Sequence, residues 1–282
     1  RGPSTIIARV TNTATSIVPG SQSRSGWPLA LAMAGIVIVA WLLATPAGLL
    51  GKADAIGYAV CHRIDLRSFH LGERPLPLCA RCTGLYLGAL LPLVGFQVAG
   101  RARHGAFPGT SVLAALLVFG AAFAVDGLNS YFSLFPGLPH LYQPSNVLRL
   151  TTGLLAGIAV GAFVHSGFQQ NVWKDWRAEP ALRVRDLGWL LAAAAGVAAL
   201  VLSDNTLILY PLALVSAAGV ILVLTSVYTV LVLLVTGREN RAVAWSELWL
   251  PGAVGLGLAL VQVGAIDLVR YALTGTWAGF TF

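Results

Sequence analysis

Charged residues are scarce in this sequence. Asp, Glu, Lys and Arg make up 10% of its 282 residues, while 57% are hydrophobic and the mean hydropathy is +0.78. Soluble domains carry about 25% charged residues, so this composition excludes an ordinary soluble globular protein. Several uncharged windows of about twenty residues are long enough to cross a hydrocarbon core roughly 30 Å thick. We therefore expect an all-α, polytopic integral membrane protein embedded in a lipid bilayer.

The sequence also lacks the motifs of several common functions. It contains no G-x-S-x-G, Walker A or H-E-x-x-H motif, so an enzymatic role has no direct support. It has no run of five basic residues and no recognition-helix pattern, which excludes a nucleic-acid partner. The net charge of +7 is what basic loops between membrane helices produce.

Hydrophobic runs predict about seven transmembrane helices, although six or eight also fit the pattern. The expected spans cover residues 28–50, 85–99, 111–125, 147–165, 187–202, 207–235 and 250–273. The chain begins at Arg1 and its only methionine is Met33, so we expect the numbering to start inside a longer or processed product.

These spans suggest three parts. Residues 1–26 form a polar N-terminal tail, residues 27–165 form a membrane core that includes a polar loop at 51–84, and residues 166–282 form a three-helix C-terminal extension.

The distribution of Lys and Arg predicts the orientation. They are more frequent in the segments on the N-terminal side of the membrane, so the positive-inside rule places the N-terminus in the cytoplasm. Seven spans also place the loop 51–84, the connection 126–149 and the end of the last span on one face. Asp267 and Arg270 are three residues apart in that last span, and we expect them to form a pair.

Cysteine is rare too, and all three cysteines lie in the loop before the second span. Cys79 and Cys82 form a C-x-x-C pair, and Cys61 lies upstream with His62 beside it and His70 between. Three cysteines and one histidine can complete a tetrahedral site for zinc or another thiophilic metal. Spacing leaves both histidines open as the fourth ligand. Because four protein ligands close such a site, we expect a structural role for the metal.

Other readings of the cysteines remain open. Cys79 and Cys82 precede a helix and flank Arg81, a setting that favours thiolates and thiol-disulfide exchange. Alternatively, the cysteines are small apolar side chains at a helix end. At the level of the whole protein, an accessory subunit of a membrane complex and a transporter of small solutes or ions are further hypotheses.

A second polar cluster flanks the connection between the third and fourth spans. Asp126 closes the third span, and Asn146 and Arg149 open the fourth. Because an ionisable group near hydrocarbon needs a partner, we expect Asp126 to pair with Arg149. With Arg81 and Asn146 these residues are expected to form a second layer around the cysteine loop. Helix capping by Ser145 and Asp126 is the alternative.

The residues around the cysteines match a specific pattern. Cys61-His62 is followed by R-S-F at 67–69 and LPLCARCTGLYLG at 76–88, and a weaker block spans 126–153. In these residues the sequence resembles a family of prokaryotic membrane proteins catalogued as domain of unknown function 2085. The resemblance covers roughly residues 55–165 and favours His62 over His70 as the ligand, because His70 lies outside the pattern. It implies a prokaryotic plasma membrane and no particular activity.

Overall fold

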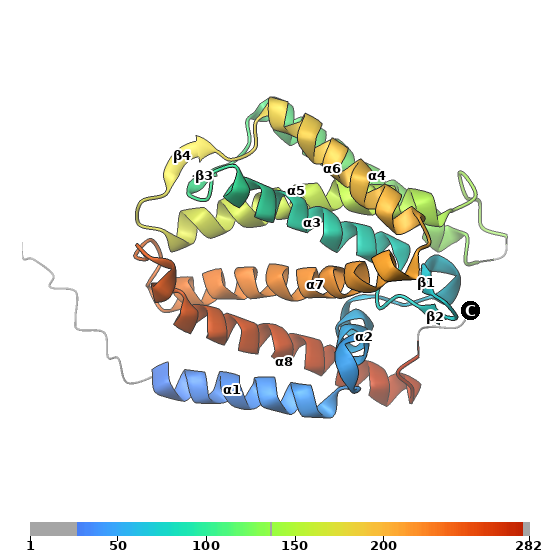
Figure 1. Ribbon diagram of the computed structural model, residues 1–282, viewed down its shortest axis with the longest axis horizontal. Helices are drawn as coiled ribbons and strands as arrows, with labels where there is room; N and C mark the ends of the chain where they lie inside the picture. The colour runs from blue at the N-terminus through green and yellow to red at the C-terminus, as the bar shows by residue number, and fades with distance from the viewer. Residues whose placement is uncertain (1–26, 136, 279–282) are drawn as a thin grey trace, which may run out of the picture.

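Seven long helices make up most of the chain in the computed structural model, which describes residues 27–135 and 137–278 (Figure 1). All seven are long and apolar enough to cross a membrane, which confirms the predicted all-α membrane architecture. They are α1 (Trp27–Ala44), α3 (Ala80–Val98), α4 (Thr110–Phe132), α5 (Asn146–Val172), α6 (Val184–Leu202), α7 (Thr206–Val235) and α8 (Trp249–Thr274). The expected polar tail, residues 1–26, lies outside the described residues.

Short elements connect these helices. They are α2 (Gly48–Val60), the 3-10 turns η2 (Asp65–Arg67) and η3 (Trp245–Glu247), and the strands β1 (His70–Leu71), β2 (Arg74–Pro75), β3 (His104–Ala106) and β4 (Arg177–Pro180). β1 pairs antiparallel with β2, and β3 pairs parallel with β4. The two pairs lie at opposite ends of the bundle (Figure 1).

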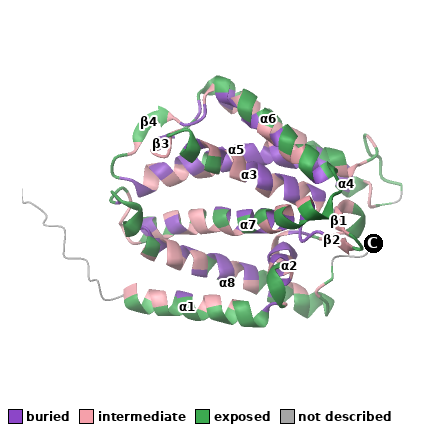
Figure 2. Cartoon of the chain, in the orientation of Figure 1, coloured by how far each residue is buried: buried purple, intermediate pink, exposed green. Residues whose placement is uncertain are grey.

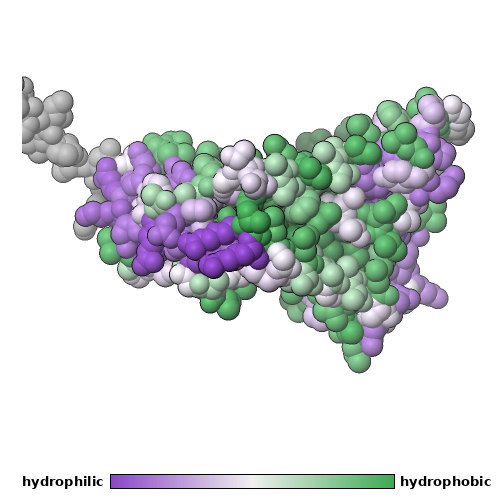
Figure 3. Space-filling model, turned by 90° about the horizontal axis from the view of Figure 1, so that it is seen from above, coloured by the Kyte–Doolittle hydropathy of each residue, from purple (hydrophilic) through white to green (hydrophobic). Residues whose placement is uncertain are grey.

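The surface has the polarity that a membrane protein requires. Hydrophilic residues gather toward both ends, and apolar residues cover the region between them (Figure 3). Within α1, Ala34 is the one buried residue, so nearly the whole helix presents apolar side chains outward (Figure 2). Such an exposed apolar band fits the interior of a bilayer.

The first predicted span is shorter than expected. We predicted a continuous helix over residues 28–50, but α1 ends at Ala44 and α2 begins at Gly48. Pro46 lies in the break, where its ring and missing N–H oppose helix continuation. Lys52 of α2 donates to the carbonyl of Thr45 at 2.9 Å and to that of Leu42, satisfying carbonyls at the end of α1. The loop before the second long span therefore begins with an ordered helix.

The core of the bundle is a close contact between α3 and α5. A Cβ added to Gly84 or Gly88 of α3 would overlap carbonyl oxygens of α5, and one added to Gly153, Gly157 or Gly161 of α5 would overlap carbonyl oxygens of α3. Glycines four residues apart let membrane helices approach to backbone contact. The matched positions run in the same direction along both helices, so the N-termini of α3 and α5 meet at one end of the molecule.

Candidate metal centre

The three cysteines converge at that end, between α2 and α3. Cys61 is the C-cap of α2, Cys79 is the N-cap of α3, and Cys82 lies in the first turn of α3. Their sulfur atoms all lie within 4.8 Å of one another, and all three are free thiols. The cluster agrees with the prediction from the sequence that Cys61 meets the distant Cys79 and Cys82.

Close backbone packing brings the two segments together. A Cβ at Gly57, in the last turn of α2, would overlap the carbonyl of Pro77, so only glycine permits this approach. The Cys61 sulfur then accepts hydrogen bonds from the backbone N–H groups of Arg63 and Cys79, at 3.4 and 3.3 Å. Ile56 of α2, Val220 of α7 and Leu78, which lies just before α3, pack around the sulfurs.

Arg270 of α8 fixes the cysteine loop from the other side. Its Nη1 donates to the carbonyls of Tyr58 and Cys61, each at 2.6 Å, and its Nη2 donates to that of His62 at 3.1 Å. The last carbonyls of a helix have no partner within the helix and attract a cation, and this explains why Arg270 reaches toward α2.

The expected ion pair between Asp267 and Arg270 is therefore wrong. Asp267 is 3% exposed, and neither of its carboxylate oxygens has a hydrogen-bond partner within residues 27–135 and 137–278. Spacing on one helical face correctly made the pair available, but the carbonyls at the end of α2 take the guanidinium instead.

Neither predicted histidine joins the sulfur cluster. Cys61 has an extended backbone, with φ −137° and ψ 143°, so consecutive side chains point to opposite sides, and His62 is exposed. His70 lies in β1, where its Nε2 is 3.0 Å from Oδ1 of Asp65. The structure thus brings together three of the four proposed ligands.

The thiols differ in their electrostatic setting. Hydrogen bonds with the Cys61 and Cys82 thiols, together with the backbone N–H groups of Arg81 and Cys82, hold the pKa of Cys79 well below its ordinary 9.0. The hydrogen bond with Cys79 and burial raise the pKa of Cys61 to about 12. One thiolate next to two thiols is a suitable starting point for metal ligation and for nucleophilic attack.

The second polar cluster lies beside the cysteines, with a different pairing from the one we expected. Asp126 binds Arg81 instead of Arg149: Nε and Nη2 of Arg81 lie 3.1 and 2.5 Å from Oδ2 of Asp126. The Tyr142 hydroxyl donates to Oδ1 of Asp126 at 3.0 Å. Arg149 donates to Oδ1 of Asn146 at 2.9 Å. Arg81 is the residue that pairs with Asp126, because close packing of α3 on α5 places the Arg81 side chain next to α4.

Asn146 connects this cluster to the cysteine loop. Its Nδ2 donates to the carbonyls of Leu66 and Ser68 at 3.4 and 3.3 Å. The predicted cap is also present, since the Ser145 hydroxyl accepts from the N–H of Leu148 at 3.2 Å. The second layer therefore holds the backbone of the loop, while the sulfurs themselves are held by α2 and α3.

Sequence reasoning missed the contacts that four residues make in this region: Arg67, Ser130, Tyr142 and Arg270. Arg67 carried a signal, since it belongs to the R-S-F block of the sequence pattern. The other three contact residues far away in the chain, and nothing in their local sequence indicates those contacts.

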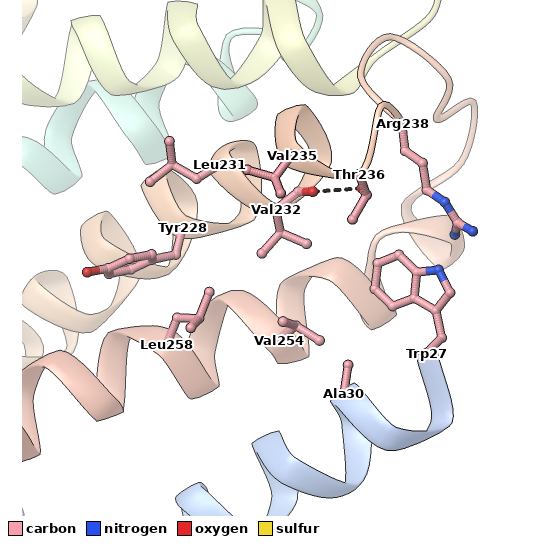
Figure 4. A pocket seen from close by; sticks show the side chains of 10 residues that line it. All are labelled: Trp27, Ala30, Tyr228, Leu231, Val232, Val235, Thr236, Arg238, Val254 and Leu258. Atoms are coloured by element: carbon pink, nitrogen blue, oxygen red, sulfur yellow. Dashed lines mark hydrogen bonds between the residues drawn. The ribbon is translucent and has the colours of Figure 1, made fainter. Parts of the chain in front are cut away.

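A separate apolar groove lies at the opposite end of α7 and α8 (Figure 4). It has a volume of about 720 Å³ and is lined mainly by α1, α7 and α8, with the Arg238 guanidinium 4.7 Å from the Trp27 ring at its edge. None of the predicted metal ligands lines it.

Comparisons with known proteins concern the part of the chain that contains the cysteines. The family described as a predicted membrane protein (DUF2085) matches residues 61–163. An uncharacterized protein of Methanothermobacter thermautotrophicus is 36% identical over 102 residues, covering 36% of this chain and 80% of the relative. An uncharacterized protein of Methanocaldococcus jannaschii is 26% identical over 123 residues, covering 44% and 72% respectively. No solved structure matches the chain.

Proposed function

The chain belongs to the DUF2085 family of predicted membrane proteins, and from this premise we propose that its cysteine cluster binds a thiophilic metal ion, best fitted by zinc. The observation that supports the proposal is the separation of the three sulfurs, all within 4.8 Å. Zinc-sulfur bonds of about 2.3 Å in a tetrahedron place sulfurs roughly 3.8 Å apart. Shifts of about 1 Å would therefore complete the ligation.

The proposed role of the metal is to join α2 to α3 at the membrane face. Cys61 ends one helix, and Cys79 and Cys82 begin the other, so one ion would fix their relative position. Structural zinc contributes about 10 to 16 kcal/mol in small peptides. Neither His62 nor His70 belongs to the sulfur cluster, so water would take the fourth position. Three protein ligands do not close a zinc site, and the structural role is therefore proposed from the place of the cysteines at the facing ends of α2 and α3.

Metal analysis of purified protein tests this proposal. Wild type prepared without chelators should carry about one zinc ion per chain, and Cys79→Ser should lose it. Thr83→Ser, which changes the residue next to Cys82 and keeps the hydroxyl, is the matched control and should retain the metal. His62→Ala should also retain it if water is the fourth ligand. Wild type without stoichiometric metal would overturn the proposal.

A second candidate function is thiol-disulfide exchange, which the lowered pKa of Cys79 favours. The Cys79 thiolate would attack a disulfide of a substrate, forming a mixed disulfide and releasing one substrate thiolate. Cys82 or Cys61 would then attack Cys79, giving a disulfide within the protein and the second substrate thiol. Alkylation distinguishes the two functions: a metal site protects all three cysteines until a chelator is added, whereas redox cysteines respond to oxidant and reductant alone.

We also propose that the protein acts as an accessory subunit of a membrane complex. The sequence has no recognised catalytic motif, and the proposed metal would shape a polar end of the molecule without acting on a substrate. Purification from native membranes in mild detergent tests this idea. A stable stoichiometric partner supports it, and a chain that purifies alone contradicts it.

A further inference from the structure

Three arginines meet next to the cysteine cluster, facing one carboxylate. Arg81 binds Asp126 and also donates from Nη2 to the Ser130 hydroxyl at 2.9 Å. Arg67 donates from Nη2 to the carbonyl of the same Ser130 at 2.5 Å. Arg149 lies within electrostatic reach of Arg67, Arg81 and Asp126. Besides the cysteine cluster, these side chains hold three cations and one carboxylate.

Two other carboxylates of this end have partners of their own. Asp54 pairs with Arg63 and Arg74, and Asp65 pairs with His70. If the proposed metal were bound, three thiolates and a divalent ion would add one further negative charge, which still leaves a cation without a counterpart. Burial, and after it the charge of Arg81, lowers the pKa of Arg67, as expected where positive charge is in excess.

Arg149 is the residue whose surroundings are incomplete. It is 6% exposed, and its buried Nε has no hydrogen-bond partner in the described part of the chain. It also lies in the first turn of α5, as Arg81 does in α3. The positive end of the helix dipole makes these poor positions for a cation. A buried guanidinium with an unused donor calls for an acceptor.

We propose that Arg67, Arg81 and Arg149 form a binding site for a phosphate-type oxyanion beside the cysteine cluster. Guanidinium groups bind such oxygens through paired charge-assisted hydrogen bonds, and the N-terminus of α5 adds favourable dipole. Arg67 is partly exposed and Arg149 is buried, so an anion would reach Arg149 from the side of Arg67. The site requires no metal, so it stands or falls independently of the proposed zinc centre.

Titration calorimetry and thermal unfolding with inorganic phosphate test the site on the detergent-purified full chain. Phosphate should bind and raise the melting temperature of the wild type. Arg149→Gln should weaken binding about tenfold or more. Arg67→Gln, at a partly exposed position, should weaken it too, and keeps the test decisive if the buried substitution prevents folding. Arg185→Gln is the matched control, because Arg185 is an exposed arginine in the first turn of α6.

A lipid headgroup could supply the same oxyanion, so a second arm uses nanodiscs. The thermal shift is compared between phosphatidylcholine alone and phosphatidylcholine with phosphatidylglycerol. Stabilisation by phosphatidylglycerol that Arg149→Gln or Arg67→Gln abolishes assigns the site to a headgroup, and stabilisation by inorganic phosphate alone assigns it to a free anion. The proposal is overturned if neither ligand binds the wild type, or if Arg185→Gln weakens binding as much as Arg67→Gln.

Discussion

The contact between α3 and α5 predicts opposite effects for two Gly→Ala substitutions. At Gly157 an added Cβ would overlap the carbonyl oxygen of Leu85 and lie 2.8 Å from the backbone nitrogen of Ala89. Both atoms belong to the backbone of α3, so no side chain can turn aside and the helices must separate. At Gly196, in α6, nothing lies within 4 Å of the added Cβ.

The energies follow from these surroundings. Overpacking costs about 1–3 kcal/mol, whereas alanine gains up to about 1 kcal/mol over glycine in a helix interior. Gly196→Ala should therefore be neutral or stabilising, and Gly157→Ala destabilising, with a difference of roughly 1–3 kcal/mol between them, because the alanine gain applies to both helices and the overpacking cost applies only at Gly157. Unfolding in detergent followed by tryptophan fluorescence measures both, since the chain contains 8 Trp. Equal stability of the two variants would refute the close helix contact.

Three further predictions concern the cysteine end of the molecule. Asp267→Asn should raise the free energy of unfolding by about 1–3 kcal/mol because it removes a buried charge without a partner; a loss of stability in the same assay would show that the carboxylate is bound. Arg270→Gln should weaken zinc affinity about 10- to 100-fold, measured by competition with a chelator, because it frees the backbone around Cys61; unchanged affinity would contradict this role. In metal-free protein, iodoacetamide should already label Cys79 at pH values below 9, because its pKa is lowered and the thiolate is the reactive form. Cys61, with a pKa of about 12, should label slowly throughout, and mass spectrometry would expose the opposite order.

The sequence predicted the long helices well because each is an apolar run bounded by polar residues. The break between α1 and α2 was missed because the apolar run continues through Thr45 and Pro46. The C-x-x-C spacing and the upstream cysteine were enough to predict that the three sulfurs meet. Helix ends and ligand types are local properties, and local sequence carries them.

Interactions that depend on how helices pack were not predictable in the same way. Asp126 had two candidate arginines, and the approach of α3 to α5 decides for Arg81. Arg270 binds backbone carbonyls 209 and 212 residues away, and a carbonyl has the same sequence signature at every position. Which backbone groups lack a partner becomes known only from the fold.

The direct backbone contact of α3 and α5 leaves little room for one helix to slide on the other, so the two helices should move together as one rigid unit. Cys79 and Cys82 belong to this rigid unit. The backbone of Cys61 is instead held to α8 by the hydrogen bond from Arg270 to its carbonyl. The three sulfurs thus lie across a seam, meaning the boundary between the α3 and α5 pair and the end of α2 that α8 holds. Any rearrangement of the bundle along this seam would change the spacing of the sulfurs, and any ion that holds them would lock it.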